Sequence, residues 1–239
     1  MSLNPALPRP IPTPASPVPD RHSSAETRHR LLESAGAVFA QKGYQAATIR
    51  EICQLAEANV AAVNYHFGDK ERLYHAVFVD FFNQAERRFP AIVAHPEGTD
   101  PEVVLASFIR NFVGRVLDPG KPSYHGKIMA REMIEPTMAM DFVFENHMRP
   151  MSAELFRIVR AMMGDRAATD TIVSVCHSII GQCVFYCHAQ PVLERMEPNL
   201  VFDETRVDAI ARHVIDFSLH AIRGMMAEFG SDSTAVKPG

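Results

Sequence analysis

Apolar residues recur at three- and four-residue spacings along most of this chain, and we find no convincing alternation of the kind that predicts a strand. The periodic segments predict helices over residues 23–43, 49–56, 60–66, 70–89, 101–117, 124–135, 140–163, 167–189 and 204–228. Pro150 lies inside one of them and predicts a kink, because proline cannot donate a helical hydrogen bond. The pattern predicts an all-α protein of about nine helices, with a small N-terminal head on a larger body.

Four N-cap signals mark helix starts in the first third of the chain. Two are capping boxes and two are single caps: Ser23 with Glu26, Thr48 with Glu51, Asn59, and Asp69. The segment 60–66 is rich in small residues, so it can approach another surface closely. Two short helices joined by a tight turn form a helix-turn-helix, whose second helix enters the major groove of DNA. The segment 48–71 therefore predicts a nucleic-acid-binding head.

The same segment closely resembles the DNA-binding core of the TetR/AcrR repressor family. In that family a Thr opens the supporting helix, and a Tyr-x-His-Phe-like run closes the recognition helix before a Lys-Glu pair. The matching residues here are Thr48, Tyr65, His66, Phe67, Lys70 and Glu71. The sequence departs from the family at Asn64, where many relatives carry an aromatic phosphate contact, and we expect Tyr65 to supply that contact instead.

The resemblance implies a set of DNA contacts in the head. We expect the major groove to be faced by Asn59, Val60, Ala61, Ala62, Asn64 and Tyr65, and phosphates to be held by Thr48, Tyr65, His66 and Lys70, with Arg50 as a further contact. Phosphate contacts position such a head, whereas contacts to base edges specify the DNA sequence.

A second resemblance concerns the body. The runs 131–151, 181–186 and 201–204, together with head residues 61–71, are similar to CecR-type regulators, which are TetR relatives, and the likeness covers residues 24–228. It implies a ligand-responsive regulator, most often a repressor, that binds double-stranded DNA as a homodimer through its last two long helices. Relatives often control neighbouring efflux or transport genes and answer to a drug-like or metabolic small molecule.

Composition divides the chain further. Residues 1–22 hold seven of the 17 prolines, which is typical of a disordered arm. We expect four segments: this arm, a helix-turn-helix domain over 23–69, an effector-binding and dimerisation domain over 70–229, and a disordered tail over 230–239. Arg9 and Arg21 would allow the arm to touch DNA, and a solvated tail without a partner is the alternative.

Methionines gather between residues 129 and 163. Methionine is flexible and polarisable, so it suits an adaptable pocket for a small molecule. We expect a mainly apolar effector cavity with a few polar anchors, lined by Phe108, Phe112, Arg115, His125, Met129, Arg131, Met133, Phe144, His147, Met151 and Tyr186. Ordinary core packing of the same side chains is the alternative interpretation.

Two apolar stripes lie on the last two long helices. One contains Val207, Ile210, Val214, Phe217, Ala221 and Met225, and the other contains Cys176, Ile180, Cys183, Val184 and Cys187. Paired with their symmetry mates they would form a four-helix interface, as the resemblance implies, and a two-fold pair of heads would require a near-palindromic DNA site. The alternative is that both stripes face only the core of the monomer.

Other classes of function find little support in the sequence. The 11 histidines occur without a nucleophile elbow, a phosphate-binding loop or a His-Glu-x-x-His run, so we expect neither an enzyme nor a cofactor. The three cysteines at 176, 183 and 187 leave metal or redox sensing open, but one helix cannot easily surround a tetrahedral ion. We therefore expect small buried side chains there and no metal.

The expected location is the cytoplasm, without membrane attachment. No uninterrupted apolar run approaches the roughly 20 residues of a membrane span, and the first residues lack the apolar core of a signal peptide. Four cysteines without a small-scaffold pattern fit a reducing compartment.

Charge leaves a second reading of the head open. The chain carries a net charge of −4, and residues 20–72 balance seven Lys and Arg against seven Asp and Glu. A basic footprint for DNA must therefore be local. The alternative is a helical small-molecule-binding or protein-adaptor module whose head no longer recognises DNA.

Overall fold

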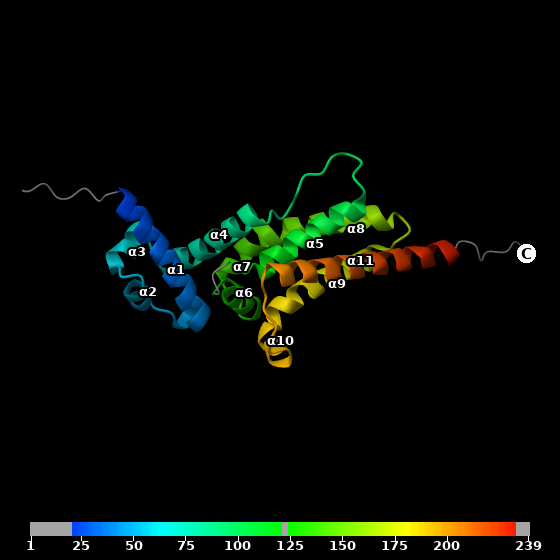
Figure 1. The fold of residues 1–239 in the computed structure, drawn as a ribbon. Coiled ribbons are helices and arrows are strands. Elements are labelled where there is room, and N and C mark those ends of the chain that lie inside the picture. The colour runs from blue at the N-terminus through cyan, green and yellow to red at the C-terminus, as the bar shows by residue number, and fades with distance from the viewer. Residues whose placement is uncertain (1–20, 121–123, 233–239) are drawn as a thin grey trace, which may run out of the picture.

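The structure, a computed structural model, describes residues 21–120 and 124–232, and these are helical almost throughout (Figure 1). In chain order the elements are α1 (Arg21–Ala46), α2 (Ile49–Leu55), α3 (Val60–His66), α4 (Lys70–Arg88), α5 (Pro101–Leu117), α6 (Tyr124–Ile134), α7 (Met138–Val143), η1 (Phe144–Met148), α8 (Arg149–Met163), α9 (Thr169–His188), α10 (Gln190–Met196) and α11 (Glu204–Asp232). The described residues contain no strand. The predicted all-α class is therefore confirmed.

The ends of the chain differ from the prediction. Most of the predicted arm and tail, residues 1–20 and 233–239, lies outside the described residues. Residues 21–22 and 230–232, which we predicted to be disordered, belong to α1 and α11. Because α1 begins at Arg21, Ser23 lies inside the helix and is not its N-cap.

The structure does not contain the single helix over 140–163, kinked at Pro150, that we predict from the sequence. The segment 138–163 consists of α7, the π-helical turn η1 and α8, and the Arg149 N–H donates to the Phe144 carbonyl five residues earlier. A proline ring crowds the carbonyl four residues before it, and a widened turn accommodates that crowding. The short helix α10 was not predicted, because it has no buried side chain and so no apolar periodicity.

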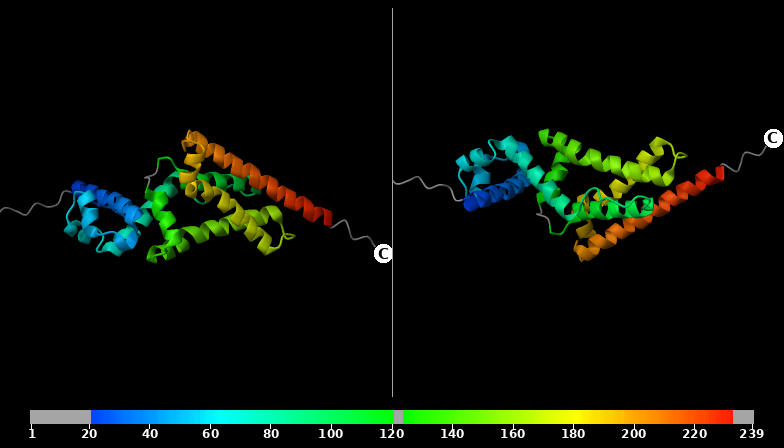
Figure 2. Two further views of the ribbon diagram at one scale, coloured as in Figure 1. Left: turned by 90° about the horizontal axis from the view of Figure 1, so that it is seen from below. Right: turned by 90° about the horizontal axis from the view of Figure 1, so that it is seen from above.

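The helices form a head and a body connected by α4. Helices α1, α2 and α3 lie together at one end of the molecule, and α4 runs from them into the body (Figure 1). In the body α5, α8, α9 and α11 pack against one another (Figure 2). Helix α4 therefore belongs to both parts.

Two apolar clusters hold these parts together. The body cluster is built from α5, α8, α9 and α11 and includes Leu105, Ile109, Leu155, Ile172 and Val214. The head cluster is built from α1 to α4, but it continues into α6 and α7 through Ile128, Ala139 and Val143. Packing therefore joins the head to the first part of the body, beyond α4 alone.

A turn of defined geometry sets the angle between α2 and α3. The Ala58 N–H donates to the Cys53 carbonyl at 2.9 Å, and the Glu57 N–H donates to the Gln54 carbonyl at 3.4 Å. Glu57 has φ 50°, and among the described residues it is the one non-glycine residue with a positive φ. This is the Schellman pattern, which ends a helix and reverses the chain in few residues. It places α3 across α2, as a helix-turn-helix requires.

A buried polar link joins α4 to α6 and α7. The Tyr74 hydroxyl donates to Glu132 Oε2 at 2.7 Å, and the Thr137 N–H donates to Glu132 Oε1 at 2.6 Å. Glu132 is only 1% exposed. Burial, followed by the hydrogen bond to Glu132, raises the pKa of Tyr74 above its ordinary value, so the phenol remains a donor. The link therefore fixes α4 against α6 and α7 near its N-terminal end, in the second turn of the helix.

Replacing Tyr74 by Phe is expected to lower the free energy of unfolding by about 1.5–3 kcal/mol, because Glu132 loses a buried hydrogen bond and gains no substitute. Urea denaturation measures the change. Tyr65→Phe is the matched control. It also removes a phenolic hydroxyl group, but from a side chain that is 78% exposed, so it should leave stability unchanged. Equal losses in the two variants would contradict the role of the link.

Candidate nucleic-acid interface and ligand cavities

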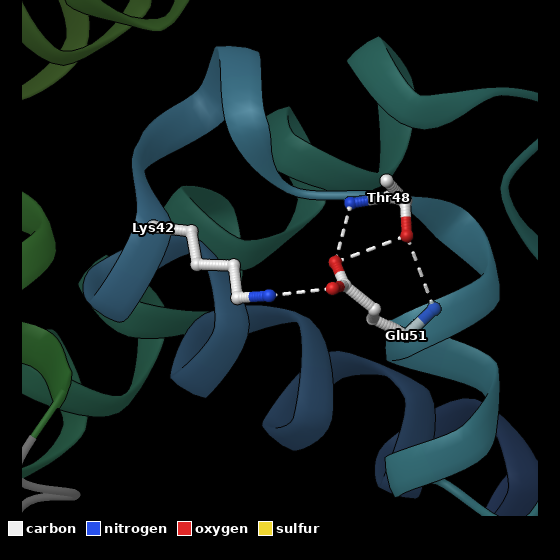
Figure 3. A network of polar contacts seen from close by, with 3 residues as sticks. All are labelled: Lys42, Thr48 and Glu51. Atoms are coloured by element: carbon white, nitrogen blue, oxygen red, sulfur yellow. Dashed lines mark hydrogen bonds and ion pairs between the residues drawn. The ribbon is translucent and has the colours of Figure 1, made fainter.

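The N-terminus of α2 is fixed by a capping box that a lysine from α1 reinforces (Figure 3). The Glu51 N–H donates to Thr48 Oγ1 at 3.3 Å, and the Thr48 N–H donates to Glu51 Oε2 at 3.2 Å. Lys42 Nζ lies 2.5 Å from Glu51 Oε1. The hydrogen bond from Lys42, followed by that from Thr48, lowers the pKa of Glu51. Thr48, which we predicted to hold a phosphate, thus has its hydroxyl engaged in positioning α2.

Helix α3 presents one face to the core and the opposite face to solvent. Asn59 caps it, with the Ala62 N–H donating to Asn59 Oδ1 at 2.8 Å, and Val63 is fully buried. The outward side chains are Val60, Ala61, Asn64 and Tyr65, all of them exposed, whereas Ala62 is half-buried. A short helix with small outward residues is a shape that can enter a groove closely.

The side chains predicted to contact phosphates differ in whether they already interact with other groups of the protein. Lys70 Nζ donates to the Gln45 carbonyl at 3.2 Å and lies 4.7 Å from the centre of the Tyr44 ring, so it joins α4 to the end of α1. Arg50 is exposed and forms none of the ion pairs found among the described residues. Burial, with a smaller effect of Arg28, lowers the pKa of His66, which therefore offers a neutral imidazole at neutral pH.

Arg28 is a candidate phosphate contact that the sequence analysis missed. Its guanidinium lies 5.3 Å from the centre of the Phe67 ring, directly after the end of α3. Arg28 is exposed, and its positive charge contributes, after burial, to the lowered pKa of His66 in α3. No local pattern on α1 marks it, because its proximity to α3 arises only when α1 folds over the helix-turn-helix.

The residues predicted to line one effector cavity are divided among several places. His147 and Met151 line a cleft of about 280 Å³ beside α4. Arg115 and His125 line a cavity of about 30 Å³ between α4, α5 and α6, and Phe108 lines a third small cavity of about 10 Å³. Phe112 is buried in the body core beside Phe108, and Tyr186 packs against that core.

The remaining predicted effector residues face other surroundings. Arg131 Nη2 donates to the Gln41 carbonyl of α1 at 3.2 Å, and Met129 packs against the head cluster. Met133 and Phe144 are exposed, and the Arg149 guanidinium lies 4.9 Å from the centre of the Phe144 ring. In this conformation these four residues do not line the cavities that His147 and Arg115 line.

The two stripes assigned to a dimer interface mostly face the core of the monomer. Val207, Ile210 and Val214 of α11, and Cys176 and Cys183 of α9, are buried in the body cluster. The large exposed apolar side chains on these helices include Phe217 at 57% exposure, which belongs to the predicted α11 stripe, and Phe185 at 53%, which belongs to neither stripe. The alternative interpretation therefore holds for the buried positions, and a partner would meet the faces of α9 and α11 that the monomer leaves exposed.

Two of the three cysteines of α9 have the environment of structural thiols. Burial raises the pKa of Cys176 to about 11 and that of Cys183 to about 12. A thiol with so high a pKa is a poor nucleophile and a poor metal ligand at neutral pH. In the part of the chain that the structure describes, no cluster of His, Cys, Asp and Glu has the arrangement of a metal site.

Helix α9 is the one described helix that is long and apolar enough to span a bilayer by length and composition. We had expected no such segment. Its buried residues include Ile172, Cys176 and Ile179, which pack into the body cluster as core side chains do. Core packing accounts for one face of α9 and leaves its second apolar face open.

Two protein families match the chain. The one described as HTH-type transcriptional dual regulator CecR, C-terminal domain, matches residues 101–222, and the one described as bacterial regulatory proteins, tetR family, matches residues 31–77. The HTH-type transcriptional dual regulator CecR of Shigella flexneri is 27% identical over 200 residues, which are 79% of this chain and 88% of that protein. The HTH-type transcriptional repressor NicS of Pseudomonas putida is 36% identical over 81 residues, which are 33% and 38% of the two chains.

Solved structures share the fold. A bacterial regulatory protein of the tetR family from Rhodococcus RHA1 has a TM-score of 0.61 at 21% identity, and the match covers 82% of this chain and 96% of that one. AibR in complex with isovaleryl coenzyme A and operator DNA has a TM-score of 0.56 at 14% identity, and the match covers 80% and 97%. At these identities the likeness concerns the fold alone.

Proposed function

The chain belongs to the TetR family of bacterial regulatory proteins and carries the C-terminal domain of CecR-type regulators, and from this premise we propose that it is a ligand-released repressor that binds a near-palindromic operator as a homodimer. It is a helix-turn-helix transcriptional regulator and not an enzyme. The proposal includes the cytoplasm as its location and genes for efflux or transport as its targets.

The observation that carries the proposal is the outward face of α3. Two caps and a Schellman turn fix α3 against α2, so its orientation is set before any DNA is met. Asn64 and Tyr65 are exposed on it and bring hydrogen-bonding groups that could reach base edges or phosphates. Arg28 and Arg50 lie on neighbouring elements as local positive charges. A locally basic face is sufficient for phosphate contacts even though the whole head is neutral.

Dimerisation is supported by the second apolar face of α9 and α11. Phe185 and Phe217 are large exposed apolar side chains, and Gly181 and Gly224 lie on the same helical faces, four and seven residues away. A Cβ atom added at either glycine would meet nothing within 4 Å. Glycine inside a helix costs about 1 kcal/mol relative to alanine, so the monomer has no packing reason for it. Close approach of a second copy supplies such a reason.

Ligand response is supported by the cavities that adjoin α4. The cleft of about 280 Å³ and the cavity of about 30 Å³ both include side chains of α4 in their walls. A ligand in either place would shift the C-terminal end of α4, whose N-terminal end lies in the head. A relative whose name states a response to a small molecule, the HTH-type nicotine-responsive transcriptional repressor HdnoR of Paenarthrobacter nicotinovorans, agrees with a sensory body.

The deciding experiment is DNA binding by the full-length protein. Fragments of the source genome that the protein retains are sequenced, and one retained fragment is then titrated at several salt concentrations. We expect a near-palindromic site and a steep fall of affinity with salt, because phosphate contacts release counterions. A protein that binds small molecules but retains no DNA would instead be the adaptor or ligand-binding module that a neutral head permits.

Lys70→Ala is expected to weaken binding to all DNA sequences alike and to lower the salt slope by about one unit, because an ammonium that holds a phosphate carries no sequence information. The hydrogen bond of Lys70 to Gln45 in the free protein occupies only one of its three donors. Lys127→Ala, which removes an exposed lysine on α6 outside the helix-turn-helix, is the control and should leave binding unchanged. A change in the preferred sequence would contradict a phosphate role for Lys70.

A further inference from the structure

Two ion pairs fasten the C-terminal end of α4 to α5. Arg88 Nη1 lies 2.7 Å from Asp118 Oδ2, and Arg115 Nη1 lies 2.6 Å from Glu86 Oε2. Arg115 Nη1 also donates to the Phe89 carbonyl at 2.8 Å, where α4 ends. The two partners differ in exposure, since the Arg115 side chain is 6% exposed and the Glu86 side chain 50%. A buried cation is thus paired with a carboxylate that solvent reaches.

One part of that buried cation lacks a protein partner. Arg115 Nη2 is buried and has no hydrogen-bond partner among the described residues. An unsatisfied buried donor costs roughly 1–3 kcal/mol, and more when the group is charged, so it requires an explanation. Arg115 lines the cavity of about 30 Å³, together with Phe81, Phe89 and His125. That space is on the scale of a single small polar group.

A larger cleft adjoins the same ion pair. Its volume is about 280 Å³, and Glu86 is part of its wall together with Phe82, Ile92, His147, Pro150 and Met151. Because Glu86 lines the cleft and Arg115 lines the small cavity, the ion pair lies between the two. The His147 ring stacks on Phe82 with centroids 3.8 Å apart. The wall also includes Asn83, Ala91 and Asn146, and the surface that it exposes to the cleft is mainly apolar. A buried positive charge, that of Arg115, lies behind Glu86.

We propose that the effector is a small apolar monocarboxylate, whose body occupies the larger cleft and whose carboxylate replaces Glu86 on Arg115. The carboxylate of the ligand would accept hydrogen bonds from Nη1 and from the unpartnered Nη2 of Arg115. This is the bidentate arrangement that a guanidinium favours. The inference rests on the proposed function and specifies the chemical class of its effector.

This site supplies a physical route from ligand to head. Displacing Glu86 removes one of the two ion pairs that hold the end of α4 to α5, and it leaves the pair between Arg88 and Asp118 and the hydrogen bond from Arg115 to the Phe89 carbonyl. Helix α4 then has less restraint at its body end, and it begins at Lys70 in the head. Ligand binding and DNA binding thereby favour different positions of α4, and coupling of this kind is reciprocal.

The test uses the full-length protein with benzoate and octanoate as probes, and with benzamide and octan-1-ol as uncharged counterparts. Binding is measured by thermal shift and calorimetry on the unmodified protein and on Glu86→Gln. We expect the acids to bind and the neutral compounds not to bind. Glu86→Gln should bind the acids roughly tenfold more tightly, because the competing negative charge is gone. The variant should also bind operator DNA more weakly without any ligand.

Two further variants complete the design. Glu102→Gln removes a carboxylate paired with Arg223 at the other end of α5, and it should leave acid binding unchanged. Arg115→Gln should lose acid binding. Because Arg115→Gln removes a buried ion pair and can reduce folding, Glu86→Gln is the deciding variant and Arg115→Gln counts only if its circular dichroism is native.

Several outcomes would overturn the proposal. The first is that the acids bind the unmodified protein and Glu86→Gln with equal affinity. The second is that the neutral compounds bind as tightly as the acids. The third is that the acids bind neither protein. DNA binding that persists together with such a result would leave the repressor function intact. If the acids bind but do not change the affinity for DNA, the binding site on Arg115 stands and its proposed coupling to the head is contradicted.

Discussion

Replacing Ala61 by Glu is expected to abolish specific DNA binding, with a loss of affinity on the order of 100-fold or more. Ala61 is exposed on the outward face of α3, at the second position of the helix. A carboxylate there would meet the phosphates at close range in both heads of a dimer. The loss of one matched base pair costs roughly 1–3 kcal/mol, and the substitution affects both half-sites. Titration of the operator by the variant measures the loss.

The same substitution should not weaken the fold. A negative charge in the first turn of a helix interacts favourably with the helix dipole, and Ala61 has no buried contact to lose. The expected free energy of unfolding is therefore equal to that of the unmodified protein or slightly higher. Ala153→Glu, at an exposed position of α8, is the matched control and should bind DNA normally. Normal DNA binding by Ala61→Glu would contradict the assignment of α3 as the recognition helix.

The head could be predicted closely because its signals are local. Thr48, Asn59 and Asp69 are caps whose partners lie three residues away, and the structure contains all of these caps. Helix α3 has the bounds that the sequence predicts, and so does α5, which begins at a proline after a capping aspartate. Caps of this kind depend on neighbouring residues, so three of the four could be read without knowledge of the fold. The fourth, Ser23 with Glu26, is wrong because α1 already begins at Arg21.

The contacts between distant segments could not be predicted. Lys70 donates to a carbonyl 25 residues earlier, and Arg115 pairs with a glutamate 29 residues earlier. Nothing in the local sequence around Lys70 or Arg115 distinguishes a structural cation from one that binds a ligand. The division of the predicted effector residues has the same origin, because Arg131 meets α1 only after α6 has packed along it.

The orientation of α9 shows a further limit of periodicity. Its apolar residues extend around the helix, with Cys183 buried on one side and Phe185 exposed on another. A helix that is apolar on more than one side has no single preferred face in the pattern. The sequence could indicate that α9 needs two partners, but it could not assign which face meets the monomer core. The structure assigns the core face, and the remaining face becomes the candidate interface.

Replacing Phe217 by Arg is expected to convert a dimer into a folded monomer. Phe217 is 57% exposed on α11, so the monomer loses little by the change, whereas a desolvated interface would have to bury an unpaired guanidinium. We expect the dimer dissociation constant to rise by about 100-fold or more, as for the loss of an aromatic interface anchor.

Sedimentation equilibrium measures the dissociation constant, and circular dichroism reports the fold. Val103→Arg is the matched control, because Val103 is 55% exposed on α5 and should leave the dimer intact. DNA binding should weaken together with dimerisation, since a single head holds only one half-site. If Phe217→Arg and Phe185→Arg both remain dimers at micromolar concentration, the exposed face of α9 and α11 is not the dimer interface. Two-fold operator binding would then require another surface.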